Sequence, residues 1–311
     1  MALDDYSTIE DLIDYTIPQL ECIATGAIST TRNSGWPRLV ELESMKTLAP
    51  TLVRETIGST ILQSKTDRTL AQLDQRVEDA IPFSFTRENG FWVEDKASLT
   101  IFCSKLHGIM LTSMLQATVP IREEPYAKWH GAGDYKSQCD AAFGFFCRES
   151  GKEITVVGQS KLSKDWNFKN VEPVIGKSFD NVKKMKQSNR NPLRQLASNA
   201  LAYDTCWSFI HTEKEFVLAR VYKVRETDEL QESLKGYKEY RDAEEENLGI
   251  EMMTIPWNQP RGPDTLSALE GLFLWAILSF HDDYRELVFK DELAPMTQVL
   301  DAVKLMLQSH L

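Results

Sequence analysis

The chain has 311 residues, of which 42% are hydrophobic and 26% charged, and its formal net charge is −11. This composition is typical of a soluble globular protein, and the length is sufficient for one large domain or a core with helical additions. Apolar runs stay well short of the roughly 20 residues that cross a bilayer, so we expect no membrane partner.

The start of the chain and its cysteines both favour an intracellular protein. Residues 1–5 are acidic and lack the apolar core of a targeting segment. The five cysteines show no metal-ligand spacing, and an odd number without a signal peptide favours reduced thiols. We therefore expect a nuclear or cytoplasmic protein.

The first third of the chain is predicted to be mainly helical. Apolar residues recur at helical spacing through residues 6–80, first in residues 9–20 and then in residues 39–57 and 60–77. A first strand is expected near residues 91–93. Residues 99–115 are apolar at helical spacing and predict a further helix.

A β-hairpin is predicted at residues 138–161. Ser150-Gly151 is a turn dipeptide, because glycine supplies the positive φ of a tight turn. With these two residues as the loop, Glu149 faces Lys152, which is a stabilising opposite-charge pair across the strands.

The register of this hairpin brings chemically interesting residues together. It places Ala142 opposite Gln159 and Asp140 opposite Lys161. Because side chains alternate along a strand, an acid, an amide and a lysine then share one face of two neighbouring strands.

The chain after the hairpin begins with an irregular stretch. Residues 162–190 show no clear period and are predicted to be a long surface loop or short helices. A helix is then expected with Asn191 as N-cap and Pro192 as its first residue, running to about Tyr203.

The last third of the chain is predicted to mix strands and helices. A second hairpin is expected at residues 207–222, followed by a charged stretch at 226–248 that is helical or disordered. Residues 252–256 read as a final edge strand. An apolar helix at 266–280 and an amphipathic helix at 295–307 complete the chain.

The element order resembles the PD-(D/E)XK nuclease superfamily over roughly residues 90–225: a strand with Asp140, a strand with Gln159-Ser160-Lys161, a helix and two strands. The Gln-x-Lys form is similar to the variant of Mrr-type restriction endonucleases, in which Gln replaces the usual acid. The whole chain looks most like the PD-(D/E)XK nuclease-like proteins of fungi. The resemblance implies an α/β protein with a restriction-endonuclease-like central mixed sheet and helical additions at both ends.

The resemblance also implies an organisation along the chain. Residues 1–88 would be a helical region packed on the core, residues 89–260 the PD-(D/E)XK-like core, and residues 261–311 C-terminal helices of the same compact unit. The helical additions would either complete the core or bury a homodimer interface.

The activity implied by the resemblance is Mg²⁺- or Mn²⁺-dependent hydrolysis of nucleic-acid phosphodiester bonds, with DNA as the expected substrate. Asp140 and Gln159 would be the metal ligands, since Mg²⁺ prefers oxygen ligands. Lys161 would orient or help deprotonate the attacking water and stabilise charge on the phosphate. Gln195 would support the site from the following helix.

One face of that helix carries Gln195, Asn199 and Tyr203 at four-residue spacing. In the superfamily, a Gln-x-x-x-Tyr pair on the corresponding helix points at the site, and Asn199 stands at the position of the tyrosine. The alternative is that these residues are the polar face of a packed helix.

A basic segment follows the proposed site. Residues 161–194 contain nine Lys or Arg and three acids, whereas residues 226–251 contain ten acids and three bases. Phosphate contacts, which would make binding salt-dependent, are predicted for Lys183, Lys184, Lys186, Arg190 and Arg194. A solvated basic face is an equally good interpretation.

The proposed ligand set has one carboxylate, so we expect a second acid from elsewhere. Candidates are Glu94, Glu123, Glu124 and Asp134. Without one, the alternative is a catalytically inactive PD-(D/E)XK-fold protein that binds nucleic acid or a protein partner through the same face. In a further alternative, the helical ends form a protein-binding module and the hairpin carries only an ion pair.

Overall fold

The computed structural model describes residues 7–15, 20–23, 36–45, 48–66, 72, 86–87, 90–118, 126–131, 141–147, 151–235 and 246–309. Among the predicted site residues, Asp140 lies outside the described residues, as do Glu123, Glu124 and Asp134.

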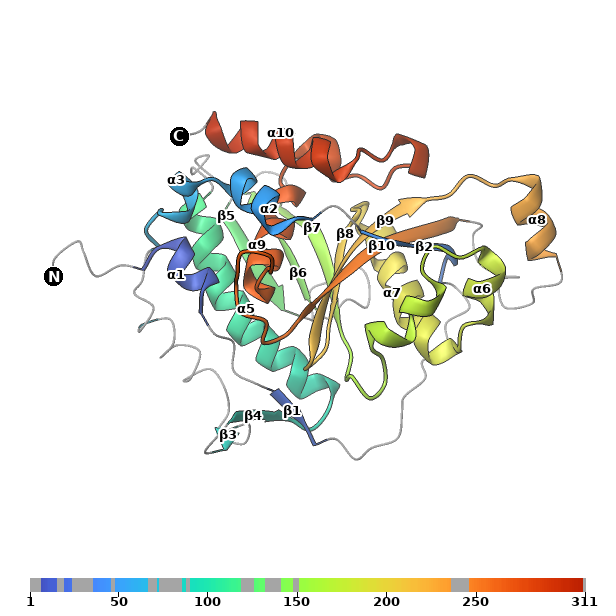
Figure 1. Cartoon of the computed structure of the whole chain (residues 1–311), viewed down its shortest axis with the longest axis horizontal. Coiled ribbons are helices and arrows are strands. Elements are labelled where there is room, and N and C mark those ends of the chain that lie inside the picture. The colour runs from blue at the N-terminus through green and yellow to red at the C-terminus, as the bar shows by residue number, and fades with distance from the viewer. Residues whose placement is uncertain are drawn as a thin grey trace, which may run out of the picture.

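A central sheet of seven strands organises the molecule (Figure 1). Its order is β2 (Arg38–Ser44), β10 (Asn247–Pro256), β9 (Glu215–Lys223), β8 (Trp207–His211), β7 (Gly151–Ser160), β6 (Ala141–Cys147) and β5 (Tyr126–Gly131). The pairs β7–β8 and β2–β10 are parallel, and the other neighbours are antiparallel. The predicted α/β class with a mixed sheet is therefore confirmed.

Helices cover both faces of this sheet. Consecutive residues of β7 and its extension contact opposite layers, because Ser160 Oγ lies 2.6 Å from Thr100 Oγ1, whereas Lys161 Nζ donates to Gln195 Oε1 at 3.0 Å. Thr100 belongs to α5 (Lys96–Thr118) and Gln195 to α7 (Gln187–Tyr203). Helix α7 is thus the crossover between the parallel strands β7 and β8.

The helices with the strongest apolar patterns form as predicted. Helix α9 (Ala268–Ser279) is capped by Ser267, whose Oγ accepts from the Glu270 amide at 3.1 Å, and each of its residues is buried. Helix α10 (Met296–Gln308) closes the described chain. A helix that is apolar on all sides requires burial on all sides, and α9 is buried in this way.

Helix α5 is the one described helix long and apolar enough to cross a membrane by length and composition alone. In the fold, 67% of its most apolar window is buried, and it packs against α9 and β5. Burial in the core accounts for its hydropathy.

The prediction of helices throughout residues 6–80 is wrong in two places. Helices α1 (Ile9–Ile13), α2 (Pro50–Ile57) and α3 (Ser59–Leu62) are present, but β1 (Leu20–Cys22) and β2 are strands. Strand β2 pairs in parallel with β10 and buries Leu39, Val40 and Leu42, so pairing with a distant strand overrides the local pattern. Strand β10 is also longer than predicted. Because β2 pairs with it, β10 lies inside the sheet and not at its edge.

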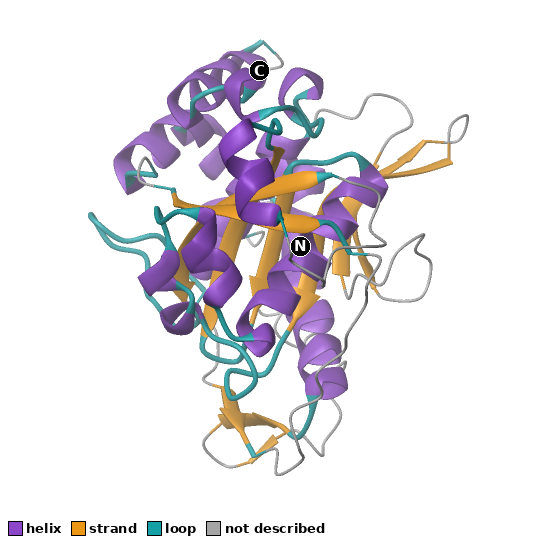
Figure 2. Ribbon diagram, turned by 90° about the vertical axis from the view of Figure 1, so that its right-hand side faces the viewer, coloured by secondary structure: helices purple, strands orange, loops and turns teal. Residues whose placement is uncertain are grey.

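A second, small sheet forms at one end of the molecule (Figure 2). Its order is β1, β4 (Gly90–Val93) and β3 (Thr86–Arg87), and β4 confirms the strand predicted near residues 91–93. Strand β4 leads directly into α5, which places this sheet beside the first turn of that helix.

The predicted register of the β6–β7 hairpin is wrong. Cys147 pairs with Gly151, so Gly151 belongs to the strand and not to a two-residue turn. A bulge between Phe143 and Gly144 then shifts the register once more, and Ala142 lies opposite Val157 instead of Gln159.

The segment between β7 and α7 contains short helices, as predicted. They are two 3₁₀ turns, Phe168–Asn170 and Glu172–Val174, and α6 (Phe179–Lys184). Helix α7 ends at Tyr203 as predicted but begins at Gln187, so Pro192 lies inside it and not at its first position.

The second predicted hairpin forms from β8 and β9, and α8 (Asp228–Leu234) occupies the first part of the charged stretch at 226–248.

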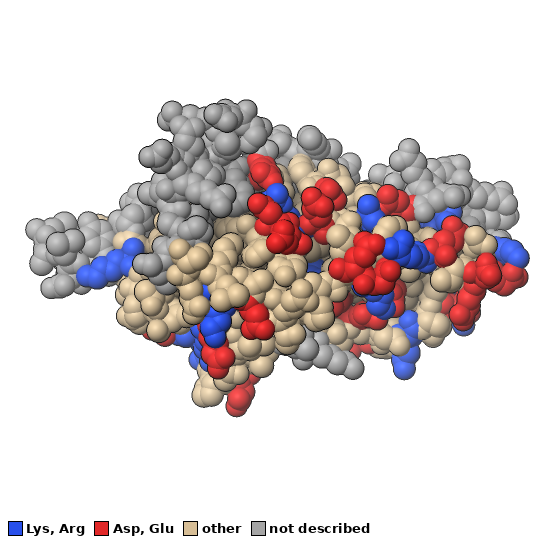
Figure 3. Space-filling model, turned by 90° about the horizontal axis from the view of Figure 1, so that it is seen from above, with Lys and Arg blue, Asp and Glu red and all other residues tan. Residues whose placement is uncertain are grey.

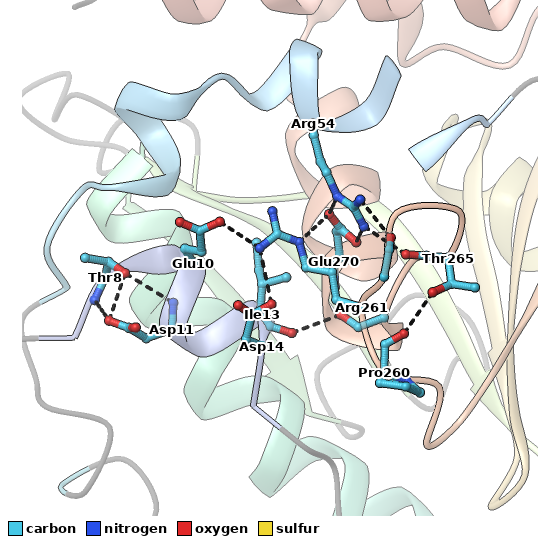
Figure 4. A network of polar contacts seen from close by, with 12 residues as sticks. Thr8, Glu10, Asp11, Ile13, Asp14, Arg54, Pro260, Arg261, Thr265 and Glu270 are labelled. Atoms are coloured by element: carbon cyan, nitrogen blue, oxygen red, sulfur yellow. Dashed lines mark hydrogen bonds and ion pairs between the residues drawn. The ribbon is translucent and has the colours of Figure 1, made fainter. Parts of the chain in front are cut away.

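A cluster of ion pairs around a buried glutamate joins the N-terminal helices α1 and α2 to the C-terminal helix α9 (Figure 4). Glu270 of α9 is fully buried and accepts from Arg54 Nε of α2 at 2.8 Å and from Arg261 Nε at 3.2 Å. Arg261 also donates to Glu10 at 2.8 Å and to Asp14 at 3.2 Å, which lie in and directly after α1. The hydrophobic core likewise includes residues from all three predicted segments, and the first of them supplies β2 to the sheet.

Candidate functional site

The carboxyl end of β7 presents the Gln-x-Lys sequence. Because side chains alternate along a strand, Gln159 and Lys161 leave on one face and Ser160 on the other. The bond from Lys161 Nζ to Gln195 Oε1 identifies the first of these faces as the one covered by α7. The structure thus brings together Lys161 and Gln195, two of the predicted site residues.

The backbone of Lys161 is fixed as well. Its amide donates to the His211 carbonyl at 3.0 Å and so extends the parallel β7–β8 ladder by one residue. The ammonium group is therefore presented from a rigid strand end and oriented by a side chain of the crossover helix.

Gln159 is the least satisfied residue of the group. It is fully buried, and neither its Oε1 nor its Nε2 atom has a hydrogen-bond partner in the part of the chain that the structure describes. Leaving a buried amide without a hydrogen-bond partner costs roughly 1–3 kcal/mol. The Gln159 side chain is therefore suited to bind a ligand.

Asn199 lies one helical turn beyond Gln195 and is also buried, with Nδ2 unpartnered among the described residues. Helix α7 is antiparallel to β7, since it begins near the end of β7 and ends at the start of β8. The four helical residues from Gln195 to Asn199 advance about 6 Å and two strand residues about 6.6 Å, which sets Asn199 level with Gln159.

The opposite face of β7 carries a polar contact that serves the fold. Ser160 Oγ lies 2.6 Å from His211 Nε2 of β8 and 2.6 Å from Thr100 Oγ1 of α5. Burial lowers the pKa of His211 well below its usual value, with nearby His107 and Lys96 acting in the same direction. Ser160 and His211 are fully buried, so they connect β7, β8 and α5 and present no nucleophile at a surface.

Two acids that sequence reasoning missed lie at this end of the sheet. Glu213, in the turn after β8, is almost fully buried and accepts hydrogen bonds from the Ser163 amide at 2.8 Å and from Ser163 Oγ. Asp165 follows Lys161 by four residues, and its Oδ1 atom is buried without a hydrogen-bond partner among the described residues.

The electrostatic surroundings of Asp165 connect it to the predicted site. Burial is the largest influence on the pKa of the Asp165 carboxyl and raises it. Glu213 raises this pKa further, whereas Lys164 and Lys161 lower it. The sequence held one signal for both acids, which is that each follows the end of a predicted strand. Loops that leave the carboxyl ends of adjacent parallel strands meet at one edge of the sheet.

Of the four acids predicted upstream, Glu94 is the one that the structure describes. Helix α5 contains no Asp or Glu, and Glu94, which precedes it, is exposed. Asp95 accepts from the Ser98 amide at 2.7 Å and caps α5, which lowers the pKa of this carboxyl. Within the described ranges, no group of three or more His, Cys, Asp or Glu is placed to hold a metal ion.

Two of the five predicted phosphate-binding residues are part of the interior. Arg190 and Arg194 are each 2% exposed. Arg194 donates to the carbonyls of Trp36 at 2.8 Å and Pro37 at 3.1 Å, and Arg190 donates to the Lys183 carbonyl at 2.8 Å. As placed, both guanidinium groups satisfy main-chain acceptors beside α7 and are not presented to a phosphate.

The three lysines of the same set lie nearer the surface. Lys183 pairs with Asp180 at 2.8 Å and donates to the Ser233 carbonyl at 3.3 Å. Lys184 and Lys186 are exposed. Of the five predicted phosphate contacts, these three lysines are the ones that lie near the surface.

Comparisons of the chain with protein-family models, with curated proteins and with solved structures gave no match. Its class rests on the geometry above: a mixed α/β protein whose parallel β7–α7–β8 unit carries a lysine, three amides and two acids at one end.

Proposed function

We propose that this chain is a metal-dependent nuclease of the PD-(D/E)XK type that hydrolyses phosphodiester bonds, with DNA as the expected substrate. The observation that carries the proposal is the end of β7, where fully buried Gln159 and the Lys161–Gln195 pair face the same crossover helix. The antiparallel order β5–β6–β7, followed by α7 and parallel β8, also supports a restriction-endonuclease-like core.

The residues present fit a divalent cation. The Oε1 atom of Gln159 is a neutral oxygen ligand, buried and without a hydrogen-bond partner among the described residues. Asp140 directly precedes β6, whose first residue, Ala141, pairs with Gly158 beside Gln159. Asp140 and Gln159 would hold the ion, which supplies Lewis acidity to the phosphate and lowers the pKa of a bound water.

Lys161 would stabilise the charge that develops on the phosphate during attack. Gln195 accepts one of its three ammonium protons, which limits the rotamers of a flexible side chain. The ladder bond to the His211 carbonyl holds the backbone that carries this lysine. Lys161 is therefore pre-organised for a role that needs a fixed positive charge.

A protein that keeps this fold without the chemistry is the second candidate. The absence of an acid from α5 favours it, and so does the burial of Arg190 and Arg194. On the α10 side of the molecule, which Figure 3 shows, acidic and basic side chains lie close together, so this side offers no field of a single sign to a nucleic acid. Such a protein would bind nucleic acid or a protein partner through the same end of the sheet.

The test is cleavage of plasmid and linear DNA with Mg²⁺ or Mn²⁺ by the wild type, Asp140→Ala and Lys161→Ala. The proposal expects cleavage that both substitutions abolish while circular dichroism shows folded proteins. No cleavage by the wild type with either metal would reject the nuclease, and DNA affinity would then separate a nucleic-acid binder from a protein binder.

A further inference from the structure

A chain of polar side chains lies behind the proposed site, on the face of β7 that α5 covers. Ser160 is the middle residue of the Gln-x-Lys sequence, and its Oγ atom lies 2.6 Å from His211 Nε2 and 2.6 Å from Thr100 Oγ1. The Thr100 hydroxyl also donates to the Lys96 carbonyl at 2.9 Å. Ser160 and His211 are fully buried. Three side chains therefore connect β8, the end of β7 and the first turn of α5.

The surroundings of His211 decide where its ring carries a proton. The Nδ1 atom is buried and has no hydrogen-bond partner among the described residues. The rings of Phe209 and Phe216 lie beside the imidazole, with centroids 5.8 and 5.7 Å away, and neither carries a polar acceptor. A proton on Nδ1 would be a desolvated donor without an acceptor, which costs roughly 1–3 kcal/mol. The neutral ring with its proton on Nε2 avoids this cost.

This tautomer sets the direction of the whole chain of hydrogen bonds. The Lys96 carbonyl can only accept, so it takes the single proton of the Thr100 hydroxyl. Ser160 then donates to Thr100 Oγ1, and His211 Nε2–H donates to Ser160 Oγ. Every donor has an acceptor in this order. In the reverse order Ser160 would donate to Nε2, and the ring proton would lie on Nδ1.

The main chain of His211 holds the next residue of β7. Its carbonyl accepts from the Lys161 amide at 3.0 Å. His211 therefore fixes two consecutive residues, Ser160 through its side chain and Lys161 through its backbone. Consecutive strand residues leave on opposite faces, so a rotation of Ser160 would also turn Lys161 away from Gln195 of α7.

We infer that His211, as the neutral Nε2–H tautomer, is a positioning residue that fixes the end of β7 and with it the proposed catalytic Lys161. This inference rests on the proposed function and adds to it a residue from the opposite face of the sheet. Ser160 transmits the effect, and Thr100 anchors the chain on α5. These side chains act on the backbone of the lysine and do not face the substrate. Their loss should therefore slow the chemical step without changing the affinity for DNA.

The first measurement is the ¹H–¹⁵N spectrum of the histidine rings in the full-length chain, at pH 7 and without DNA. It distinguishes a ring protonated on Nε2, on Nδ1 or on both nitrogens. The His211 ring is assigned through its contacts with the rings of Phe209 and Phe216. We expect the Nε2–H form. The Nδ1–H form or the doubly protonated ring would overturn the inference.

The second measurement is the single-turnover rate of DNA cleavage with Mn²⁺, together with DNA affinity, for Thr100→Val and Ser160→Ala. Valine keeps the shape of Thr100 and removes its hydroxyl. The matched control is Thr118→Val, because Thr118 lies in the same helix and donates to the carbonyl four residues earlier at 2.8 Å. We expect cleavage about ten-fold slower at unchanged DNA affinity in Thr100→Val and Ser160→Ala, and wild-type behaviour in Thr118→Val. Thermal unfolding confirms the fold of each variant.

The outcomes separate this inference from the function on which it rests. Unchanged cleavage in folded Thr100→Val and Ser160→Ala would overturn the positioning role and leave the nuclease in place. An equal loss in Thr118→Val would also overturn it, since the effect would not depend on contact with β7. No cleavage by the wild type would overturn the nuclease and this role together.

Discussion

The substitution Glu270→Gln tests the role of the ion cluster that joins the two ends of the chain. Glu270 is fully buried, and the side chains of its partners Arg54 and Arg261 are 20% and 13% exposed. The amide keeps the shape of the side chain but removes the charge that both guanidinium groups face. Among the described residues, Arg54 then keeps only main-chain acceptors, whereas Arg261 keeps the carboxylates of Glu10 and Asp14.

The size of the effect follows from what the arginines retain. Removing one partner of a buried ion pair costs about 3–5 kcal/mol, because an uncompensated charge remains. Arg54 still donates to the carbonyls of Gly262 and Thr265, each at 2.8 Å, and Arg261 still contacts Glu10. We therefore expect a loss at the lower end, about 3 kcal/mol of unfolding free energy.

Urea unfolding of the wild type and Glu270→Gln measures this difference. The matched control is Glu292→Gln, because Glu292 pairs with Arg225 at 2.6 Å while both side chains are about half exposed. An exposed pair contributes about 0–1 kcal/mol, so the control should stay within that range. A loss below about 1 kcal/mol in Glu270→Gln would refute the assignment of the cluster as a buried, mutually dependent unit.

Two further predictions concern the interior around β7 and α5. A Cβ atom at Gly158 would lie 2.0 Å from the Phe209 ring of β8. Gly158→Ala should therefore lower the free energy of unfolding by about 1–3 kcal/mol in urea unfolding. An unchanged free energy of unfolding would show that Phe209 moves aside at little cost. Burial lowers the pKa of His107 to about 3. The unfolded chain then binds a proton near pH 6.5 that the folded chain refuses until about pH 3, so stability falls as the pH drops through this window, by on the order of 5 kcal/mol in full. His107→Gln should make this acid limb less steep in urea titrations from pH 7 to pH 4, while buried His211 continues to contribute to it; an unchanged limb in His107→Gln would contradict the burial argument.

The parts of the fold that could be predicted are those with a strong local signal. Helix α9 is apolar on every side and has a serine cap, and both features depend only on neighbouring residues. Strand β2 carried no such signal, because it is a strand only through its pairing with β10, roughly 200 residues later. The register of β6 and β7 depends on a bulge, and the residues of the turn do not predict that bulge.

The site divides in the same way. The common face of Gln159 and Lys161 follows from strand alternation, and the approach of Gln195 follows from a crossover helix, so both could be predicted. Asp165 and Glu213 were missed because their positions depend on how two loops turn after the strands end.

The basic segment shows the limit of counting charges. Arg190 and Arg194 look like surface residues in the sequence, but main-chain carbonyls beside α7 take up their donors and allow them to be buried. Composition gives the number of charges in a segment and not the direction in which they point.

The most direct test of the central claim is the single-turnover rate of DNA cleavage with Mn²⁺ by Lys161→Ala and by Lys177→Ala. Lys177 is exposed and lies in the same basic segment, so its loss removes a comparable charge away from the end of β7. We predict a loss of at least 100-fold for Lys161→Ala and a rate close to that of the wild type for Lys177→Ala. Equal rates for the two variants, or no cleavage by the wild type, would contradict a catalytic lysine at this position.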